Sequence, residues 1–455
     1  MSESPEHPQT PPFAQSASRI AAHPAVRIAL ILLGLAFFVY ASVRVVHHQQ
    51  RAGHGSSTFH DLNQYGDGDW GVYYRAGLAM RLRLPIYTLE HGPLLTFKNP
   101  PAVALLIAPL STLPVGWARW IWLVGDLICL VLIYRVAARV IFSPDDSGPL
   151  RAALMAGAIF LSSHYVLDEL FSGTTSLLYL LSTVAAFVWA KEDKPIRAGA
   201  ALGLAVCLKV VPLAFLPWLV LCRRPGRSVS SFAATLAVLL LLPAAWVGPS
   251  RNWALLRQWP QHLAHTEIKV QDYRPTNQSL SAMLTRTFTP APDLPGLYHV
   301  NIASLSPRVA HAIWFACSCL IGGLIYAWIL LQRHRERPYS AAALSLLLLF
   351  MTLCNPLAWR YTYIALGIAC LYVLRALARG MRPYRPIIAL LAASYLLHFA
   401  PESLQALSAR FWGAVALAAA VVLASRWDSM RINSRVDRQV AFESSRADAD
   451  HQKPR

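Results

Sequence analysis

Apolar residues follow one another along this chain in long uncharged blocks, without the alternation or stripes of elements that face water on one side. A bilayer core about 30 Å thick takes ~20 apolar helical residues to cross. Blocks close to that size recur between residues 25 and 425, and they predict an all-α integral membrane protein with about 10–12 transmembrane helices. The predicted segments are 28–43, 118–141, 151–167, 174–190, 198–210, 212–222, 229–248, 309–332, 340–354, 358–378, 384–399 and 408–425.

Some of the apolar segments differ from simple spans. Segment 28–43 is longer than a signal-peptide core and no small-residue cleavage site follows it, so we expect a retained helix. Segments 198–210 and 212–222 are short and contain Pro212 and Pro217, which predicts a hairpin that does not cross fully. Segment 100–114 is apolar but holds four prolines, which is typical of a re-entrant or interfacial element.

Composition and charge support the membrane assignment. Only 14% of the residues are charged and 55% are hydrophobic, whereas soluble domains average ~25% charged residues. The formal net charge of +18 would indicate nucleic-acid binding in a soluble protein. Here most basic residues stand in short connectors between apolar blocks, which is typical of membrane orientation signals, and no nucleic-acid partner is predicted.

The distribution of these basic residues predicts the topology. Short loops near 168–173 and 400–407 have no Lys or Arg, so they are expected outside and the alternate, basic loops in the cytoplasm. The chain then divides into a disordered cytoplasmic N-terminus (1–24), a polytopic domain (25–425) with long outer loops at about 47–99 and 249–308, and a cytoplasmic tail (426–455). We expect a multi-pass protein of the cell (inner or plasma) membrane. The basic loops contain Lys191, Lys194 and Arg197; Arg223, Arg224 and Arg227; Arg333, Arg335 and Arg337; and Arg375, Arg379, Arg382 and Arg385.

The first outer loop carries the strongest candidate for chemistry. Asp67 and Asp69 precede Tyr73 and Tyr74 shortly before the chain re-enters the membrane. A carboxylate at a membrane surface, between aromatic walls, is placed to accept a proton from a hydroxyl. The alternative is a solvated, turn-forming Gly-Asp-Gly-Asp loop without catalytic function.

Four further residues could bind substrate. Lys209 lies inside an apolar segment, where a cation either faces a polar partner such as a phosphate or snorkels to the interface. In the second outer loop, Asn277 and Gln278 could hydrogen-bond sugar hydroxyls or only form turns. Arg360, in an outer turn after Trp359, could hold phosphate or belong to the interfacial belt. No cysteine or histidine spacing indicates a metal site.

Several motifs, taken in order, resemble glycosyltransferase family 87, a family of GT-C-type membrane enzymes that includes polyprenyl-phosphate-mannose-dependent mannosyltransferases. They cover most of the chain between about residues 69 and 361. The motifs are D-W-G-V-Y-Y-R-A-G-L-A from Asp69, P-I-Y from Pro85, N-P-P-A-V-A-L-L-I-A-P-L-S-T-L-P from Asn99, W-A-R-W-I-W from Trp117, A-G-A-A-L-G-L-A-V-C-L-K-V-V-P from Ala198, C-R-R-P-G-R from Cys222, N-Q-S-L from Asn277 and N-P-L-A-W from Asn355.

The resemblance implies a GT-C-type bundle with a long first outer loop. It also implies glycosyltransferase activity and roles for individual residues. Asp69 matches the family's first-loop aspartate, the general base, with Asp67 as its rival. Lys209 matches a lysine for donor phosphate, and Asn277 and Gln278 match the second-loop Asn-Gln. The chain departs from the family pattern at Asn99, where the family has tyrosine, at Thr174, where it has glutamine, and at the Arg360-Tyr361 pair, where histidines are usual. These departures lie where substrate contacts are expected. They therefore bear on which sugar and which acceptor are used more than on the class of reaction.

The sequence thus predicts a hexosyltransferase that moves a sugar, mannose by resemblance, from a polyprenyl-phosphate donor to a glycan or glycolipid hydroxyl on the outer face, with inversion. Membrane lipid is the other expected partner. No cofactor is predicted, and dependence on a divalent metal is left open. Two alternatives remain: a lipid-linked-sugar flippase or transporter that uses the same intramembrane charges, and a polysaccharide polymerase or ligase that uses outer-loop arginines. Those arginines are Arg251, Arg257, Arg274, Arg286 and Arg308.

Overall fold

The described part of the chain is helical throughout. The computed structural model describes residues 39–40, 43, 68–87, 96–265, 272–290, 300–333, 339–381 and 384–427, and these ranges contain helices, turns and no strand. The predicted all-α membrane fold is therefore confirmed. The first apolar block, 28–43, lies almost entirely outside the described residues.

Five of the described helices are long and apolar enough to cross a membrane, or six if a bent pair counts as one span. Four further apolar helices are shorter: α8 (Ser176–Lys191), α9 (Pro195–Leu208), the Val211–Val220 segment (η3 and α10) and α17 (Ala341–Leu353). The total of about 10–12 crossings therefore stays a prediction. The five are α5 (Val115–Ile141), Pro225–Val247 (α11 and α12), Pro307–Leu331 in α16 (Pro307–Arg333), Arg360–Ala378 (η4, Arg360–Ala365, and α18, Leu366–Ala378) and Ala409–Trp427.

The bent pair replaces a segment that was expected to be a single straight span. Helix α6 (Gly148–Leu161) meets α7 (Ser163–Ser172) at 67°. Between them, the Ser162 hydroxyl donates a hydrogen bond to the Ala158 carbonyl over 2.8 Å, and the Ser162 backbone leaves helical geometry. A serine bonded to its own preceding turn commonly bends a helix. The bend directs α7 toward η4, with which it makes extensive contact.

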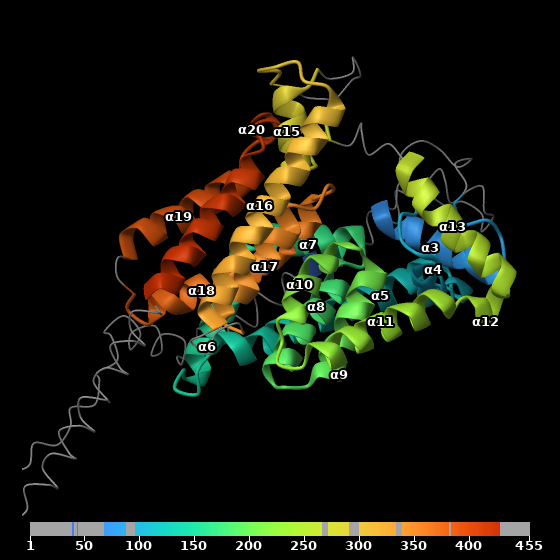
Figure 1. Cartoon of the computed structure of the whole chain (residues 1–455), viewed down its shortest axis with the longest axis horizontal. Coiled ribbons are helices and arrows are strands. Elements are labelled where there is room, and N and C mark those ends of the chain that lie inside the picture. The colour runs from blue at the N-terminus through green and yellow to red at the C-terminus, as the bar shows by residue number, and fades with distance from the viewer. Residues whose placement is uncertain are drawn as a thin grey trace, which may run out of the picture.

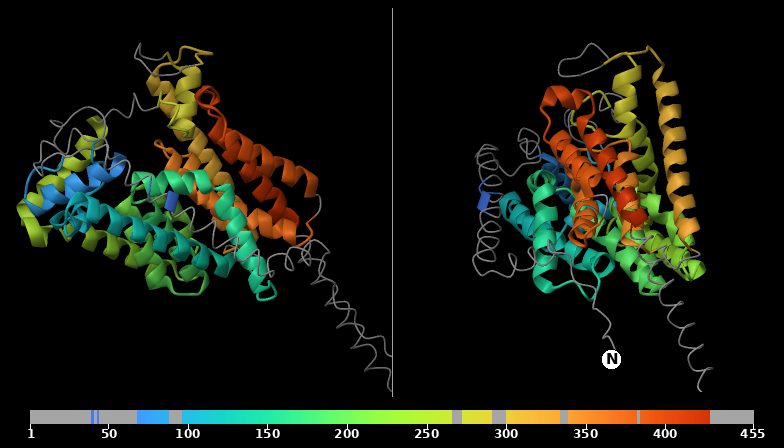
Figure 2. Two further views of the ribbon diagram at one scale, coloured as in Figure 1. Left: turned by 180° about the vertical axis from the view of Figure 1, so that it is seen from behind. Right: turned by 90° about the vertical axis from the view of Figure 1, so that its left-hand side faces the viewer.

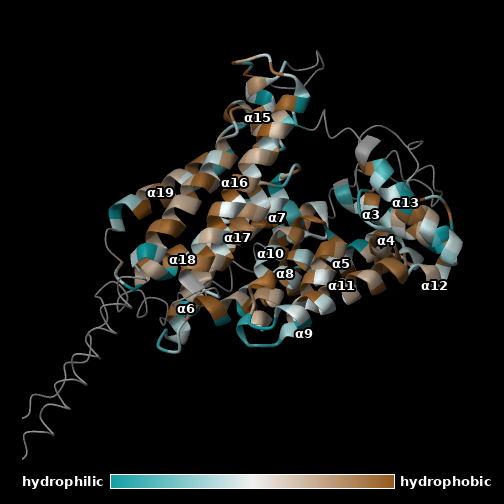
Figure 3. Ribbon diagram, in the orientation of Figure 1, coloured by the Kyte–Doolittle hydropathy of each residue, from teal (hydrophilic) through white to brown (hydrophobic). Residues whose placement is uncertain are grey.

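Burial separates the central span from the peripheral ones. Within Arg360–Ala378, 78% of the most apolar stretch is buried inside the protein, whereas the figure for α16 is 11%. Figure 3 shows that hydrophobic residues continue along helices at the edge of the molecule. In water such exposure would be costly, so the peripheral helices present their apolar side chains to lipid while η4 and α18 form the core.

The helices gather into two neighbouring groups. Helices α16 to α19 (Tyr384–His398) and Ala409–Trp427 lie on one side, and α5, α8, α9 and α11 (Pro225–Leu241) lie on the other (Figures 1 and 2). Gly199 and Gly203 allow α9 and α11 to pack closely, because a Cβ at Gly199 would overlap the Ser228 carbonyl oxygen. Small residues four apart permit such backbone approach in membrane bundles.

Parts of the two long loops that the sequence predicts to be outside meet at the far end of the second group. Helices α3 (Gly68–Arg81), α4 (Pro101–Ile107) and α13 (Pro249–His265) lie there together (Figure 1). The Trp246 indole donates to the Met80 carbonyl over 3.1 Å, and the Trp259 indole donates to the Lys98 carbonyl over 2.9 Å. The end of the Pro225–Val247 span, through Trp246, and the second loop, through Trp259, therefore fix the position of the first loop. The proline-rich segment 100–114 forms α4 and the short helix η2 (Leu110–Thr112), and neither could span a bilayer.

Candidate functional site

Asp69 lies in the first turn of α3, where it meets side chains from three other segments. It is partly exposed, and Tyr361, Lys209 and Lys98 are close enough to stabilise its charged form. We name Asp69, Lys98, Glu169, Lys209 and Tyr361 the Asp69 cluster. The amino end of a helix also favours a negative charge.

Lys209 reaches the cluster because α9 ends directly before it. Its backbone is extended, and the Asn99 side-chain amide donates to the Leu208 carbonyl over 2.6 Å, satisfying one of the terminal carbonyls of α9. The Lys209 ammonium lies 5.4 Å from the ring centroids of both Tyr179 and Tyr361, within the range of cation–π attraction. Lys209 is partly exposed and lies near the carboxylates of Asp69 and Glu169, so its ammonium faces polar partners.

Glu169 is the buried acid of the cluster. Its carboxylate accepts hydrogen bonds from the Thr174 hydroxyl at 2.7 and 2.8 Å and from the Ser176 amide at 3.1 Å, and it lies near Lys209. With no exposed surface and these bonds filled, it compensates Lys209 and is not available to a substrate. In the sequence, Glu169 is one of two adjacent acids, with Asp168, in a predicted outer turn that could line the cavity or only cap the next helix through Thr174 or Ser172. The spacing alone did not predict that Glu169 would be buried beside Lys209.

The turn that holds Glu169 depends on a glycine. Gly173 ends α7 with φ +65°, and a Cβ there would lie 2.8 Å from the guanidinium carbon of Arg119. Arg119 donates to the Leu170 and Phe171 carbonyls at the end of α7. A glycine satisfies both the left-handed backbone and the close approach.

Burial also changes the acidity of side chains in α3. Burial raises the pKa of the Asp69 carboxyl above its ordinary value, although Tyr361, Lys209 and Lys98 act in the opposite direction. A carboxylate with a raised pKa is a stronger base once it is ionised. Burial likewise raises the pKa of Tyr73, whose hydroxyl faces Thr175. Tyr73 therefore lines the cluster as a neutral phenol.

The other residues predicted in the first loop are placed differently. Asp67 lies outside the described residues. The Tyr74 hydroxyl donates to the Leu113 carbonyl over 2.8 Å, which ties α3 to the end of η2 and directs the phenol away from Asp69.

Asn277 and Gln278 bind the protein's own backbone. The Asn277 amide donates to Asp272 and to the Pro356 carbonyl, both at 3.1 Å, and accepts from the Ala358 amide at 3.0 Å. The Gln278 amide donates to the Pro275 and Gln405 carbonyls at 2.6 and 2.7 Å. Both residues are fully buried. They hold the turn that precedes Arg360 and Tyr361, and so position Tyr361 against Asp69.

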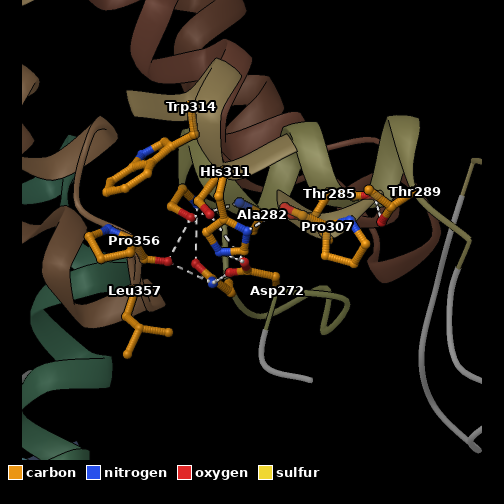
Figure 4. A network of polar contacts seen from close by, with 12 residues as sticks. Asp272, Ala282, Thr285, Thr289, Pro307, His311, Trp314, Pro356 and Leu357 are labelled. Atoms are coloured by element: carbon orange, nitrogen blue, oxygen red, sulfur yellow. Dashed lines mark hydrogen bonds and ion pairs between the residues drawn. The ribbon is translucent and has the colours of Figure 1, made fainter. Parts of the chain in front are cut away.

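Around Asn277 lies a second polar group, which Figure 4 shows from close by. We name Asp272, Asn277, Ser281, Arg286 and His311 the Asp272 network. The Arg286 guanidinium donates to the carbonyls of Asp272, Arg274 and Asn277 at 2.7–3.0 Å and to the Ser408 hydroxyl at 2.6 Å. Arg286 has no exposed surface, so it is not one of the accessible arginines that a polymerase or ligase would need.

Arg360 belongs to neither group. Its guanidinium binds the Asp168 carboxylate in bidentate fashion, with contacts of 2.9 Å and 3.0 Å. Lys209, not Arg360, is therefore the cation beside Asp69. Among the residues that the structure describes, no group of three or more His, Cys, Asp or Glu side chains is arranged to hold a metal ion.

Comparison with known proteins bears on this arrangement. The sequence model of glycosyltransferase family 87 matches residues 97–356, which include Asn99, Lys209, Asn277 and Gln278 but neither Asp69 nor Arg360. Curated proteins and solved structures give no match. The match covers more than half of the chain and agrees with the membrane helices. The chain belongs to glycosyltransferase family 87, a membrane glycosyltransferase.

Proposed function

We propose that the Asp69 cluster transfers a sugar from a polyprenyl-phosphate donor to an acceptor hydroxyl, with inversion at the anomeric carbon. The observation that carries this proposal is the position of Asp69, a partly exposed carboxylate beside the partly exposed Lys209. A displacement reaction needs a base near the attacking hydroxyl and a cation near the leaving group, and Asp69 and Lys209 supply both. The base takes a proton, and the cation stabilises the charge on the leaving group.

In this reaction, the Asp69 carboxylate accepts the proton of the acceptor hydroxyl as its oxygen attacks the anomeric carbon. The bond from that carbon to the donor phosphate breaks, and polyprenyl phosphate leaves with the bonding electrons. The Lys209 ammonium, and Lys98 nearby, stabilise the negative charge on the phosphate. Tyr361 orients the Asp69 carboxyl through a hydrogen bond.

The carboxylate count supports inversion. A retaining mechanism needs a second carboxylate about 5 Å from the first, acting on the same anomeric centre. The second acid of the cluster, Glu169, is fully buried and its oxygens are occupied by Thr174 and Ser176. One accessible base is what a direct displacement requires.

The donor, the sugar and the side of the membrane are inferred from other features. The lysine at the end of α9 and the family resemblance favour a polyprenyl-phosphate donor carrying mannose. The basic short loops favour termini in the cytoplasm and an Asp69 cluster on the outer side. A glycan or glycolipid would then reach Asp69 from outside while the polyprenyl chain lies among the helices.

The test is sugar transfer from synthetic polyprenyl-phosphate mannose in nanodiscs, comparing wild type with Asp69→Asn. We expect wild type to release polyprenyl phosphate and the variant to lose about 10²–10⁴-fold in rate, the usual contribution of a general base. Asp145→Asn, at an exposed carboxylate far along the chain, serves as the matched control and should retain full activity. Full activity of Asp69→Asn would refute the assignment of the base. Absence of release by well-folded wild type would refute this donor.

A further inference from the structure

A polar cavity of about 290 Å³ lies beside the Asp69 cluster, at the end of the bundle where α7, η4 and the turn after α19 meet. We name it the Arg410 cavity. Helix η4 carries residues for both sites: Arg360 faces the cavity, and the next residue, Tyr361, faces Asp69. The cavity is lined by His164, Pro275, Thr276, Arg360, His398, Phe399, Ala400, Gln405 and Arg410.

The cavity holds more positive than negative charge. Arg360 is neutralised by its bidentate contact with Asp168. Arg410, in contrast, is only 6% exposed, and its Nε atom donates to the His398 carbonyl over 3.2 Å. It makes no direct ion pair among the described residues, and the carboxylate that acts on it, that of Asp168, is already bound to Arg360. Two guanidinium groups therefore share one carboxylate, and an anionic ligand would balance the remaining positive charge.

Three other lining residues, His164, His398 and Gln405, each have a buried polar atom without a hydrogen-bond partner in the described part of the chain. These atoms have almost no accessible surface, so they make the wall polar but do not themselves reach a ligand. The evidence for a site is therefore the pair of guanidinium groups, Arg360 and Arg410, which share the Asp168 carboxylate at one cavity and favour an anionic ligand.

We infer that the Arg410 cavity binds a phosphate group carried by the acceptor, so that the acceptor is a phosphate-bearing glycan or glycolipid. This rests on the proposed function, in which Lys209 holds the phosphate of the donor. Guanidinium groups bind phosphate oxygens in a planar, bidentate way. Adjacent residues of η4 point to the two sites, which places the phosphate on the order of 10 Å from the reacting hydroxyl, or one to two sugar rings away.

Equilibrium binding to purified protein tests this without requiring transfer. The probes are methyl mannoside 6-phosphate, neutral methyl mannoside and polyprenyl phosphate. Wild type should bind the phosphorylated mannoside more tightly than the neutral one. Arg410→Gln should weaken the phosphorylated mannoside roughly 10- to 100-fold, the loss of a charge-assisted hydrogen bond, and leave polyprenyl phosphate unchanged.

A second variant should act in the opposite direction. Asp168→Asn removes the carboxylate that neutralises Arg360, so it should tighten binding of the phosphorylated mannoside. If Arg410→Gln unfolds at a lower temperature than wild type, Arg410→Lys, which keeps the charge, should show intermediate affinity. A loss confined to polyprenyl phosphate would overturn the inference, because the cavity would then hold the donor. Equal affinity of wild type for both mannosides would also overturn it. Neither outcome depends on whether Asp69 is the base.

Discussion

The Asp69 cluster and the Asp272 network are both rich in polar and charged side chains at the same end of the bundle. They differ in how exposed these side chains are and in how many of them already have hydrogen-bond partners within the protein. In the Asp272 network, Arg286 is fully buried and donates to carbonyls and a hydroxyl on every side. In the Asp69 cluster, Asp69, Lys209 and Tyr361 remain partly exposed. The central cation of the network uses its hydrogen-bond donors within the protein, whereas the cluster has accessible side chains that can bind a ligand.

This difference separates residues that bear the chemistry from residues that position them. A buried network whose groups are all hydrogen-bonded holds a segment in a single conformation. It has no free donor or acceptor with which to bind a substrate. The Asp272 network holds the segment before α15 (Leu280–Phe288) against the turn at Pro356, which carries Arg360 and Tyr361 on its far side. We infer that the network sets the geometry of the cluster, so its loss should lower stability first and activity as a consequence.

The largest expected effect on stability comes from Arg286→Leu. The change removes the donors to four carbonyls and to Ser408, and it also removes the cation that favours the ionised form of the buried Asp272. Each buried acceptor that is left without its hydrogen bond costs about 1–3 kcal/mol of unfolding free energy. The measurement is the apparent unfolding temperature in detergent, which should fall by many degrees.

Lys209→Met is the matched control for Arg286→Leu. It also removes a cation, but from the cluster, where the Glu169 carboxylate keeps its hydrogen bonds to Thr174 and Ser176, so we expect loss of sugar transfer with a smaller fall in unfolding temperature than Arg286→Leu causes. If Lys209→Met unfolded the protein as severely as Arg286→Leu, the distinction between the two regions would be wrong. The same conclusion would follow if Arg286→Leu abolished transfer while remaining fully stable.

A smaller effect is expected from the pH dependence of the Asp272 network. Burial raises the pKa of Asp272 to about 6 from 3.8, against the opposing effects of Ser281, His311 and Arg286. Between these two values the folded protein binds more protons than the unfolded one, so the contribution of Asp272 to stability is present at low pH and is lost as pH rises through about 6. The loss is about 3 kcal/mol at 1.36 kcal/mol per pH unit.

Asp272→Asn should therefore flatten the pH dependence of the unfolding temperature between pH 4 and pH 6. Asp145→Asn changes an exposed carboxylate and serves as the control, which should keep the wild-type slope. A slope that is unchanged in Asp272→Asn would mean that another group causes it.

Much of the fold followed from the sequence because long apolar blocks have few alternatives to membrane helices. Segments 118–141, 309–332 and 340–354 correspond closely to α5, α16 and α17. The family could also be recognised, because its motifs keep their order along the chain. The bend at Ser162 could not be predicted from hydropathy, since the apolar block continues through it and one hydroxyl directed at Ala158 decides the geometry.

The site was harder to predict because residues that are far apart in the sequence come together only in the folded protein. Asp69 and Lys209 were both expected to act, and the structure brings them together from α3 and the end of α9. Glu169 looked like an acid in a turn until its bonds to Thr174 and Ser176 were known. Arg360 was grouped with Lys209 as a donor-phosphate ligand, but its contact with Asp168 directs it into a different cavity.

The smallest expected effect is a shift in the pH profile of transfer in Tyr361→Phe. The Tyr361 hydroxyl lowers the pKa of Asp69, opposing the burial that raises it. Without the hydroxyl the Asp69 pKa should rise further, and because a general base must be ionised, the acidic limb of kcat/KM should move to higher pH. The rate on the alkaline side should change little. Tyr74→Phe, which loses only a bond to Leu113, should leave the limb in place. Two outcomes would contradict this prediction: a limb that moves equally in both variants, or one that moves toward lower pH in Tyr361→Phe. Either would show that the Tyr361 hydroxyl does not lower the pKa of Asp69 in the working enzyme.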